Sequence, residues 1–372
     1  MLGPRIAMFE SWRGRYTDSP RAISQLLAEV RPDIRQVWVA DPATEFPDGV
    51  RRVRRHSAEY FALLEANTLL VANDIITKHI VKGPRSTYLQ TWHGTPLKLI
   101  GHDEYLNGYI GAASHLKRVI RDVARWDYLV SPSPTCTELF RSAFRYDGPV
   151  LEVGYPRNDL LRSPQAAQLR TDTRAELGLS EHDMVVLYMP TWRDDVRDPQ
   201  GRLAMPTLLD FSQLARTAPS NTVILSRMHR NIAVPAVAPS LDQPGPSGRG
   251  LRVVDCSSHP EVNHLYLAAD VLVSDYSSAV YDFAVTGKPV LLLAPDLARY
   301  ADQVRGFYFD YASWAPGPVL TDTAGLAAAL WDLDVVTGEY ATRYAAFVQV
   351  FCPFEDGAAA ARVLDALDEH LG

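Results

Sequence analysis

Residues 271–293 read Val-Leu-Val-Ser-Asp-Tyr-Ser-Ser-Ala-Val-Tyr-Asp-Phe-Ala-Val-Thr-Gly-Lys-Pro-Val-Leu-Leu-Leu. The stretch begins with an apolar run of strand length at 271–274, continues with a helical pattern at 278–286, and ends with a second apolar run at 289–293. Two buried strands joined by a helix predict a parallel β-α-β unit, because parallel neighbours need a long crossover connection. The stretch therefore predicts an α/β fold with helices packed on a parallel sheet.

The same alternation extends outward along the chain in two blocks, separated by a polar stretch at 155–182 that contains prolines. We expect two doubly wound, Rossmann-like domains that face a central cleft. Their predicted boundaries are 1–158 and 159–340, and we expect the helices of 341–372 to pack back on the N-terminal domain. The other predicted strands are 5–9, 36–40, 68–72, 86–91, 127–131, 149–153, 184–189, 222–226 and 252–255. The other predicted helices are 19–30, with Ser19 as N-cap, 57–66, 110–125, 134–145, 206–217, 260–268, 324–332, 340–350 and 357–370.

The composition excludes several classes of protein. The 372 residues are 47% hydrophobic, which suits two domains with full cores. No apolar run approaches the ~20 residues of a membrane-spanning helix, and no secretory signal is recognisable. Three scattered cysteines indicate reduced thiols in the cytosol. The net charge of −7 argues against a nucleic-acid binder, although the first 160 residues carry 21 basic and 18 acidic side chains.

His93 is the first candidate catalytic residue. It lies in Tyr88-Leu-Gln-Thr-Trp-His-Gly-Thr-Pro-Leu-Lys98, where a predicted strand runs into a loop. Ligands of doubly wound sheets bind beyond the carboxyl ends of the strands, and a neutral histidine is the usual general base for a hydroxyl. Asp103 follows ten positions later and is placed to orient the imidazole. The alternative is that His93 only caps or packs a tight turn. Its position alone supports the two interpretations equally.

Polar groups also follow the strands of the second block. Arg227 and His229 follow the strand 222–226, where cations suit a diphosphate, although a solvated basic turn is the alternative. Ser277 and Ser278 precede a helix whose free N–H groups and dipole favour an anion, although ordinary capping explains them equally well. Three more side chains complete the predicted donor site: Asp282 as an acceptor for ribose or polyol hydroxyls, and Arg193 and Arg305 as phosphate ligands.

Taken together, these segments resemble the CDP-glycerol glycerophosphotransferase family, the teichoic-acid primases and polymerases. Each segment alone is a weak signal, whereas seven in one order over most of the chain are a strong one. The segments are Phe9–Gly14 with Ser19–Ala22, Gln90–Lys98 with Gly101 and Asp103, Gly154–Asp159, Tyr188–Arg193, His229, Ser274–Ser278 with Asp282, and Arg305–Asp310.

The resemblance implies a GT-B-like fold, in which a CDP-linked donor binds the C-terminal domain and a lipid-linked acceptor meets the N-terminal domain. His93 matches the family's proposed catalytic histidine, and His229 matches its second essential histidine near the donor phosphates. Ser277 and Ser278 match the serines of its pyrophosphate site. The implied reaction moves glycerol phosphate from CDP-glycerol to an acceptor hydroxyl and releases CMP, with no cofactor or metal.

The sequence leaves other donors and one non-enzymatic role open. CDP-ribitol, or a nucleotide sugar in a GT-B glycosyltransferase or epimerase, would suit the same fold. A non-catalytic binding subunit is the remaining alternative. We expect the chain in the cytoplasm, peripheral at the inner face of the cell membrane, with a lipid-linked saccharide or polyol-phosphate acceptor. The basic helix 110–125 is the candidate for membrane contact, although a helix packed in its domain with a solvated basic face is the favoured interpretation.

Overall fold

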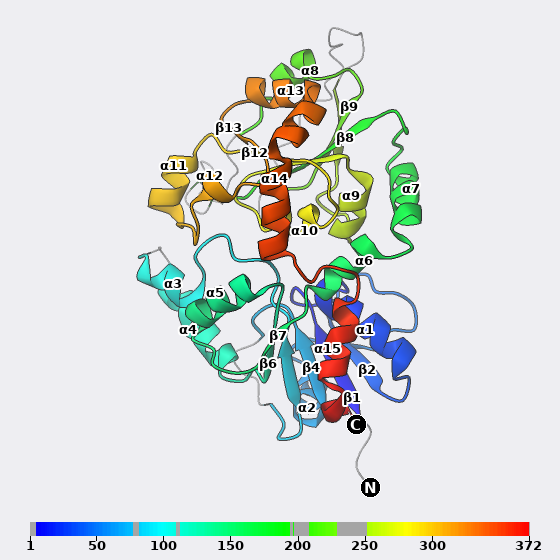
Figure 1. Cartoon of the computed structure of the whole chain (residues 1–372). Coiled ribbons are helices and arrows are strands. Elements are labelled where there is room, and N and C mark those ends of the chain that lie inside the picture. The colour runs from blue at the N-terminus through cyan, green and yellow to red at the C-terminus, as the bar shows by residue number, and fades with distance from the viewer. Residues whose placement is uncertain are drawn as a thin grey trace. The chain divides into compact units, whose positions relative to one another are not determined.

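The computed structural model describes residues 5–76, 82–108, 112–193, 196, 208–228 and 251–371. The chain forms two compact units (Figure 1). Unit 1 contains residues 1–96, 100–163 and 351–372, and unit 2 contains residues 97–99 and 164–350. The chain thus passes from unit 1 to unit 2 after Ser163 and returns after Val350, five and ten residues beyond the predicted boundaries at 158 and 340.

Unit 1 is built on a parallel sheet of seven strands in the order β3-β2-β1-β4-β5-β6-β7. Six strands were predicted, and the seventh, β3, was not, because it buries only Val53 between two exposed arginines. A single buried residue gives no recognisable periodicity, so the basic cluster around it resembled a solvated loop. The strands are β1 Ile6–Glu10, β2 Arg35–Ala40, β3 Arg52–Arg54, β4 Leu69–Ala72, β5 Thr87–Gln90, β6 Tyr128–Ser131 and β7 Val150–Glu152.

The helices of unit 1 connect these parallel strands. The first helix begins at Asp18 with Thr17 as N-cap, so the predicted cap at Ser19 was wrong by two residues. Ser19 is instead a buried residue inside the first turn. The helices are α1 Asp18–Val30, α2 Ala58–Ala66, α3 Gly101–Leu106, α4 Ala112–Val123, α5 Pro134–Phe144, η1 Pro156–Asn158, α6 Asp159–Arg162, α15 Ala359–Ala366 and α16 Asp368–Leu371.

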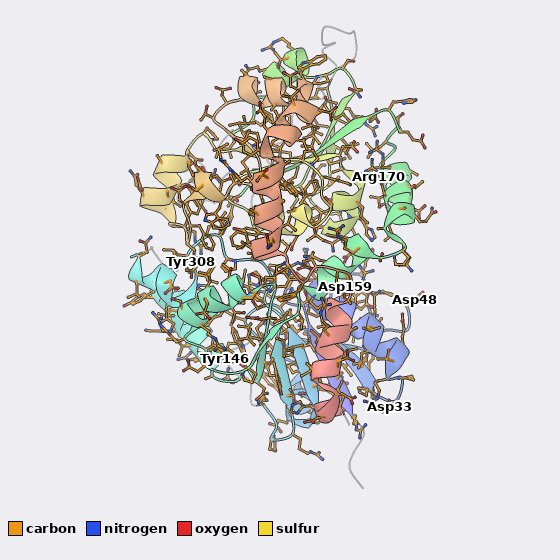
Figure 2. The ribbon with its side chains drawn as sticks, in the orientation of Figure 1. Asp33, Asp48, Tyr146, Asp159, Arg170 and Tyr308 are labelled. Atoms are coloured by element: carbon orange, nitrogen blue, oxygen red, sulfur yellow. The ribbon has the colours of Figure 1, made fainter. Side chains whose placement is uncertain are left out.

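The C-terminal segment belongs to the core of unit 1. Val363 of α15 and Leu367, the residue after this helix, are buried in one cluster with Ile23 and Leu27 of α1. The helices α15 and α1 lie side by side (Figure 1). Asp159 lies beside the start of α15 (Figure 2), where its carboxylate accepts hydrogen bonds from the first two backbone N–H groups of the helix at 2.9 and 2.8 Å. This capping satisfies donors that a helix start leaves unpaired, so α15 is fixed to the rest of unit 1.

Unit 2 repeats the plan with a parallel sheet of six strands in the order β10-β9-β8-β11-β12-β13. Its strands are β8 Met184–Met189, β9 Thr222–Ser226, β10 Arg252–Asp255, β11 Val271–Ser274, β12 Val290–Leu293 and β13 Val319–Leu320. Its helices are α7 Ala166–Glu176, α8 Phe211–Thr217, α9 Val262–Ala268, α10 Ala279–Ala284, α11 Leu297–Arg299, η2 Tyr300–Val304, α12 Tyr311–Trp314, α13 Thr323–Trp331 and α14 Leu333–Phe351, whose last residue belongs to unit 1.

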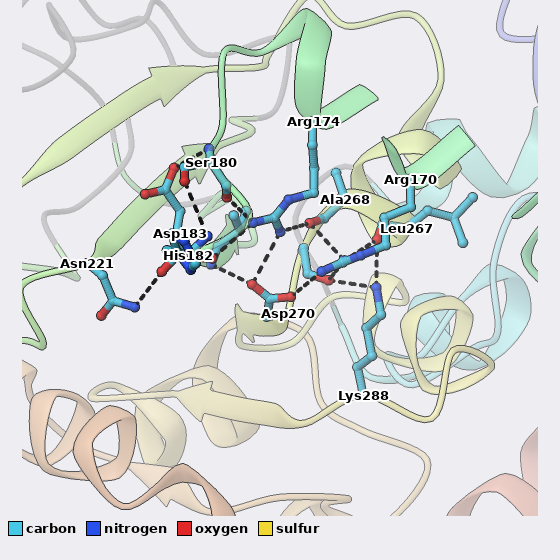
Figure 3. A network of polar contacts seen from close by, with 12 residues as sticks. Arg170, Arg174, Ser180, His182, Asp183, Asn221, Leu267, Ala268, Asp270 and Lys288 are labelled. Carbon is cyan, nitrogen blue, oxygen red and sulfur yellow. Dashed lines mark hydrogen bonds and ion pairs between the residues drawn. The ribbon is translucent and has the colours of Figure 1, made fainter. Parts of the chain in front are cut away.

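A polar network fastens α7, which was not predicted, to the end of α9 (Figure 3). Arg170 and Arg174 donate to the carbonyl oxygens that end α9 and pair with Asp270 at 2.7 and 3.4 Å. Lys288 donates to three carbonyl oxygens of the same turn, at 2.6 to 3.0 Å. Cations at a helix C-terminus satisfy free carbonyl groups and the dipole, so this network stabilises the amino-terminal edge of the sheet.

Each sheet reverses its strand order at one point, and this confirms the predicted doubly wound α/β class. In unit 1 the reversal lies between β1 and β4, and in unit 2 it lies between β8 and β11. Loops that follow such strands line the crevice where ligands of open α/β sheets bind. Among the described residues, no helix is long and apolar enough to cross a membrane.

Candidate functional site

His93 lies just beyond β5, beside the reversal point of the unit 1 sheet. Its Nδ1 atom is 2.6 Å from the backbone carbonyl oxygen of Asn73, which follows β4. A carbonyl oxygen can only accept, so Nδ1 carries the proton and Nε2 is the basic nitrogen. The ring also stacks on Trp92 at 4.3 Å between centroids and contacts Trp12 at 4.8 Å. The imidazole is therefore fixed in both tautomer and orientation.

The orientation of His93 does not come from Asp103, and this part of the sequence-based prediction is corrected. Asp103 lies on α3, where its Oδ1 atom accepts from the Ser142 hydroxyl at 3.0 Å and pairs with Arg145 at 3.7 Å. The Asn73 carbonyl takes the position next to Nδ1 that was assigned to the carboxylate. A backbone carbonyl leaves no signature in the sequence, so only the fold reveals this partner.

The turn that carries His93 is itself strongly constrained. Trp92 has a left-handed backbone with φ of 53°, and its N–H donates to the side chain of Gln90 at 2.9 Å. The Trp92 ring packs edge-on against Phe144 at 4.7 Å. A non-glycine residue adopts this conformation only when its surroundings hold it there, and such residues are concentrated at functional sites.

Two buried carboxylates near this edge of the sheet were missed in the sequence. Burial raises the pKa of Glu10 to about 7, although Arg55 lies 2.9 Å from its carboxylate and Tyr60 donates to it. Burial also raises the pKa of Asp122 to about 6, against hydrogen bonds from Trp126 and Tyr88. For Glu10 the available signal was an acidic residue directly after the apolar run Ile6–Phe9, at the end of β1.

In unit 2, the serine loop 275–278 follows β11 at the reversal point. Ser277 Oγ accepts from the N–H of Ala279 at 3.2 Å, whereas Ser278 is the N-cap of α10 without a capping bond from its side chain. Asp282 lies on α10 and is buried. The predicted order of strand, two serines and helix is therefore present, with the helix at 279–284 rather than 278–286. A role for these three residues in binding a donor stays a prediction.

Arg193 is placed differently from the expected phosphate ligand. Its guanidinium has no exposed surface and lies 2.9 Å from Asp275 and 2.8 Å from Asp296. It also lies over the rings of Tyr276 and Tyr300, at 4.8 and 5.0 Å from their centroids. Since two carboxylates and two aromatic rings surround it, the geometry assigns Arg193 to holding the serine loop to the strand end.

Three other predicted donor residues differ in how far the structure describes them. Arg227 follows β9 and donates through Nη1 to the carbonyl oxygens of Cys256 and His259, at 3.0 and 2.7 Å. Burial lowers the pKa of Arg227. Arg305 is half-buried at the end of the π-helical turn η2. His229 lies outside the described residues.

The described residues also bear on metal binding. Within 5–76, 82–108, 112–193, 208–228 and 251–371, no group of three histidine, cysteine or acidic side chains is arranged to hold a metal ion. The described residues offer a fixed basic imidazole in unit 1 and a strand-end loop with hydroxyls in unit 2.

Comparison with known proteins supplies the family. Residues 2–369 match the model of the family described as CDP-Glycerol:Poly(glycerophosphate) glycerophosphotransferase. A teichoic acid poly(glycerol phosphate) polymerase from Staphylococcus epidermidis is 34% identical over 99% of this chain, which spans 51% of that protein. A teichoic acid glycerol-phosphate transferase from Staphylococcus aureus is 34% identical over 97% of this chain and 92% of its own length. The chain thus spans about half of the first relative and most of the second.

A solved structure shares the fold over the whole chain. The wall teichoic acid polymerase TagF superposes with a TM-score of 0.87 at 34% identity, covering 99% of this chain and 89% of the other. A histidine-to-asparagine variant of TagF was solved after soaking with CDPG, and it superposes with a TM-score of 0.85. The GT-B-like fold predicted from the sequence is confirmed by this likeness.

Proposed function

Because the chain belongs to the CDP-glycerol:poly(glycerophosphate) glycerophosphotransferase family, we propose that it transfers glycerol phosphate from CDP-glycerol to a hydroxyl of a lipid-linked acceptor. Membership confirms the resemblance that the ordered motifs indicated. The product is teichoic acid or a related cell-envelope polymer, and CMP is released. The observation that carries the proposal is the fixed His93, whose basic Nε2 lies at the ligand-binding edge of unit 1.

In the proposed reaction, an acceptor hydroxyl attacks the phosphorus that carries the glycerol. The new P–O bond forms as the bond from that phosphorus to the bridging oxygen breaks, and CMP leaves with the electron pair. His93 Nε2 takes the hydroxyl proton, and its Nδ1–H stays bonded to the Asn73 carbonyl, which favours the resulting imidazolium. Phosphoryl transfer of this kind depends mostly on positioning and charge stabilisation.

The donor side of the proposal rests on unit 2. Loops beyond β9 and β11 carry the groups that would hold the diphosphate, namely Arg227, Ser277 and Ser278, with Arg305 beyond β12, and Asp282 on α10 would accept from ribose or polyol hydroxyls. His229 is assigned to the donor phosphates by the family resemblance alone. Arg193 supports this site indirectly in the proposal, because it fixes Asp275 at the base of the serine loop.

A direct assay tests the proposal. Purified protein is incubated with CDP-glycerol and a short lipid-linked disaccharide, and CMP release and product mass are followed. A mass gain of one glycerol phosphate identifies a primase-like transferase, and a ladder of such gains identifies a polymerase. If the protein releases no CMP from CDP-glycerol but turns over CDP-ribitol or a UDP-sugar, the proposed donor is wrong.

Thermal protection separates the donor classes without turnover. A ligand at about 100 times its dissociation constant stabilises the folded state by ~2.7 kcal/mol. We expect CMP and CDP-glycerol to raise the unfolding temperature, whereas protection by UDP alone would indicate a glycosyltransferase.

A His93→Ala variant that leaves cell-wall synthesis unchanged would favour a non-catalytic subunit.

The helices α3 and α4 of unit 1 are proposed to contact the membrane that holds the acceptor. On α4, Leu116 and Val119 are buried in the unit, whereas Lys117 and Arg121 are exposed. Exposed apolar side chains accompany these cations, because Ile120 is 45% and Leu106 of α3 is 71% exposed. Basic side chains beside exposed apolar ones are typical of surfaces that bind anionic lipid.

Charge reversal tests this contact. The double variant Lys117→Glu, Arg121→Glu is expected to lose binding to anionic phosphatidylglycerol vesicles in a flotation assay. The matched control is Arg52→Glu, Arg54→Glu on the edge strand β3, which changes the net charge by the same amount at another exposed site. Equal binding by both variants would contradict the assignment of α4.

A further inference from the structure

A left-handed turn follows β1 immediately beside His93. Trp12, Arg13 and Gly14 have consecutive φ angles of 45°, 62° and 113°. The carbonyl oxygen of Ser11 closes the turn by accepting from the N–H groups of Gly14 and Arg15, at 2.9 and 2.8 Å. L-residues disfavour this conformation, so Trp12 and Arg13 adopt it only because other contacts hold them.

Asn73 joins this turn to His93. Its side-chain Oδ1 accepts from the backbone N–H of Trp12 at 3.1 Å, while its backbone carbonyl accepts from His93 Nδ1. The Trp12 ring lies 4.8 Å from the imidazole, at an angle of 52°. The strained turn thus places the Trp12 indole against His93, which also stacks on Trp92 at 4.3 Å.

Asp18 holds the far end of the indole. The Nε1–H of Trp12 donates to Asp18 Oδ2 at 2.9 Å, and Asp18 Oδ1 lies 3.3 Å from Arg157. Both charged side chains are almost wholly buried, at 10% and 5% exposure. Arg157 in turn lies over the Tyr155 ring at 4.0 Å. Asp18 also has a left-handed backbone, with φ of 65°.

The electrostatics of Asp18 suit a permanent anion. Burial would raise its pKa, but Arg157, the Ser19 N–H and the Trp12 indole outweigh burial and lower the pKa below its ordinary value. The charge of His93 acts on Asp18 in the same direction. Asp18 therefore stays a carboxylate, the form that accepts the Trp12 indole N–H and pairs with Arg157.

We propose that Asp18 is a positioning residue for His93: held by Arg157, it fixes the Trp12 indole against the imidazole and thereby aims Nε2. The proposal rests on the proposed function, in which Nε2 takes the proton of the acceptor hydroxyl. Asp18 acts through Trp12 and needs no contact with either substrate. It takes the role that the sequence had assigned to Asp103.

Two variants and one control test the proposal. Asp18→Asn tolerates the left-handed backbone but removes the charge, and Trp12→Phe keeps a ring but removes the indole N–H. Asp33→Asn is the control, since Asp33 is an exposed carboxylate that pairs with Arg31 in the same unit. Because a misplacement of ~1 Å can cost ~100-fold in rate, we expect kcat to fall 10- to 100-fold in both variants. The KM for CDP-glycerol is expected to stay within twofold.

Histidine ¹⁵N NMR provides a readout that needs no turnover. The His93 signal is identified by its absence in His93→Asn. In the wild type we expect a protonated Nδ1 and a basic Nε2, and in Asp18→Asn and Trp12→Phe a shift toward the tautomeric average. Unchanged His93 signals in both variants, or a kcat equal to that of Asp33→Asn, overturn the role of Asp18. A wild type that turns over no CDP-glycerol overturns the proposed function instead, and the NMR comparison still decides on Asp18.

Discussion

The guanidinium of Arg193 and the carboxylate of Asp275 lie 2.9 Å apart although neither side chain has more than 1% of its surface exposed. Asp296 adds a two-pronged contact, with Nε and Nη2 of Arg193 donating at 2.8 and 2.9 Å. The ion cluster thus ties the ends of β11 and β12 to the segment after β8. The conformation of the serine loop 275–278 therefore depends on Arg193.

Removing this arginine is predicted to destabilise unit 2. Arg193→Ala leaves two carboxylates without their cation, and breaking a buried pair in this way costs ~3–5 kcal/mol. Arg299→Ala is the control, since Arg299 is 43% exposed and 3.9 Å from the same Asp296. An exposed pair of this kind contributes ~0–1 kcal/mol. Urea unfolding measures both, and similar losses would contradict a structural role for Arg193.

The fixed tautomer of His93 leads to a prediction about activity. His93→Ala removes the base, so transfer is expected to fall ~10²- to 10⁴-fold. Binding of CDP-glycerol is expected to be unchanged, because the donor groups are assigned to unit 2. Isothermal titration with CDP-glycerol and the CMP-release assay measure the two effects separately. Wild-type turnover by this variant would refute the role of His93 as base.

Gly14 is predicted to tolerate no side chain. With φ of 113°, a Cβ atom there would lie 2.3 Å from the backbone nitrogen of Asp41. We expect Gly14→Ala to lower the free energy of unfolding by about 3 kcal/mol, from backbone strain plus displacement of the Asp41 segment. Gly49 has φ of 81° and no atom within 4 Å of an added Cβ, so Gly49→Ala should cost ~1 kcal/mol. If Gly14→Ala and Gly49→Ala lose the same free energy of unfolding in thermal unfolding, backbone strain alone determines the cost and the close approach to Asp41 adds nothing.

Glu10 gives the stability a defined pH dependence. Burial raises its pKa from 4.5 to about 7, so between these values the folded state binds the proton more tightly than the unfolded chain does. The free energy of unfolding should therefore fall as pH rises from about 5 to 7, by up to ~3 kcal/mol. Glu10→Gln should remove this contribution.

The two proteins share every other titratable group, so the difference between wild type and Glu10→Gln isolates Glu10. Urea unfolding at pH 5, 6 and 7.5 provides the measurement. Asp122→Asn is the comparison. Because the pKa of Asp122 is raised only to about 6, its effect on the free energy of unfolding should level off at a lower pH than that of Glu10. An identical slope in Glu10→Gln and wild type would show that Glu10 is ionised throughout.

Strands were predicted most accurately where the strand itself is an uninterrupted apolar run. Strands such as β8, β11 and β12 are continuous apolar runs, and every one of them lies within a residue of its predicted bounds. The helix α7 was missed because its sequence contains few apolar residues. It is held by Arg170 and Arg174, whose partners lie about a hundred residues further along the chain.

The site shows the same division. The loops with His93, Arg227 and the serines were found because they follow apolar strands. The groups that hold them were not: the Asn73 carbonyl beside His93 and the carboxylates around Arg193 are brought together only by the order of strands in each sheet. The type of a residue and its place after a strand predicted which chemistry it could perform. Its hydrogen-bond and ion-pair partners could not be predicted, because the tertiary structure brings them together.

The helix α15 has a consequence for how the chain is made. Nearly all of unit 2 is one uninterrupted segment, 164–350, whereas unit 1 needs residues from both sides of that segment. On a ribosome, unit 2 can complete its core while unit 1 still lacks the helix that covers Ile23 and Leu27. Until α15 emerges, that apolar face stays open to chaperones and proteases. Unit 1 therefore closes only on a chain that has been synthesised through α15.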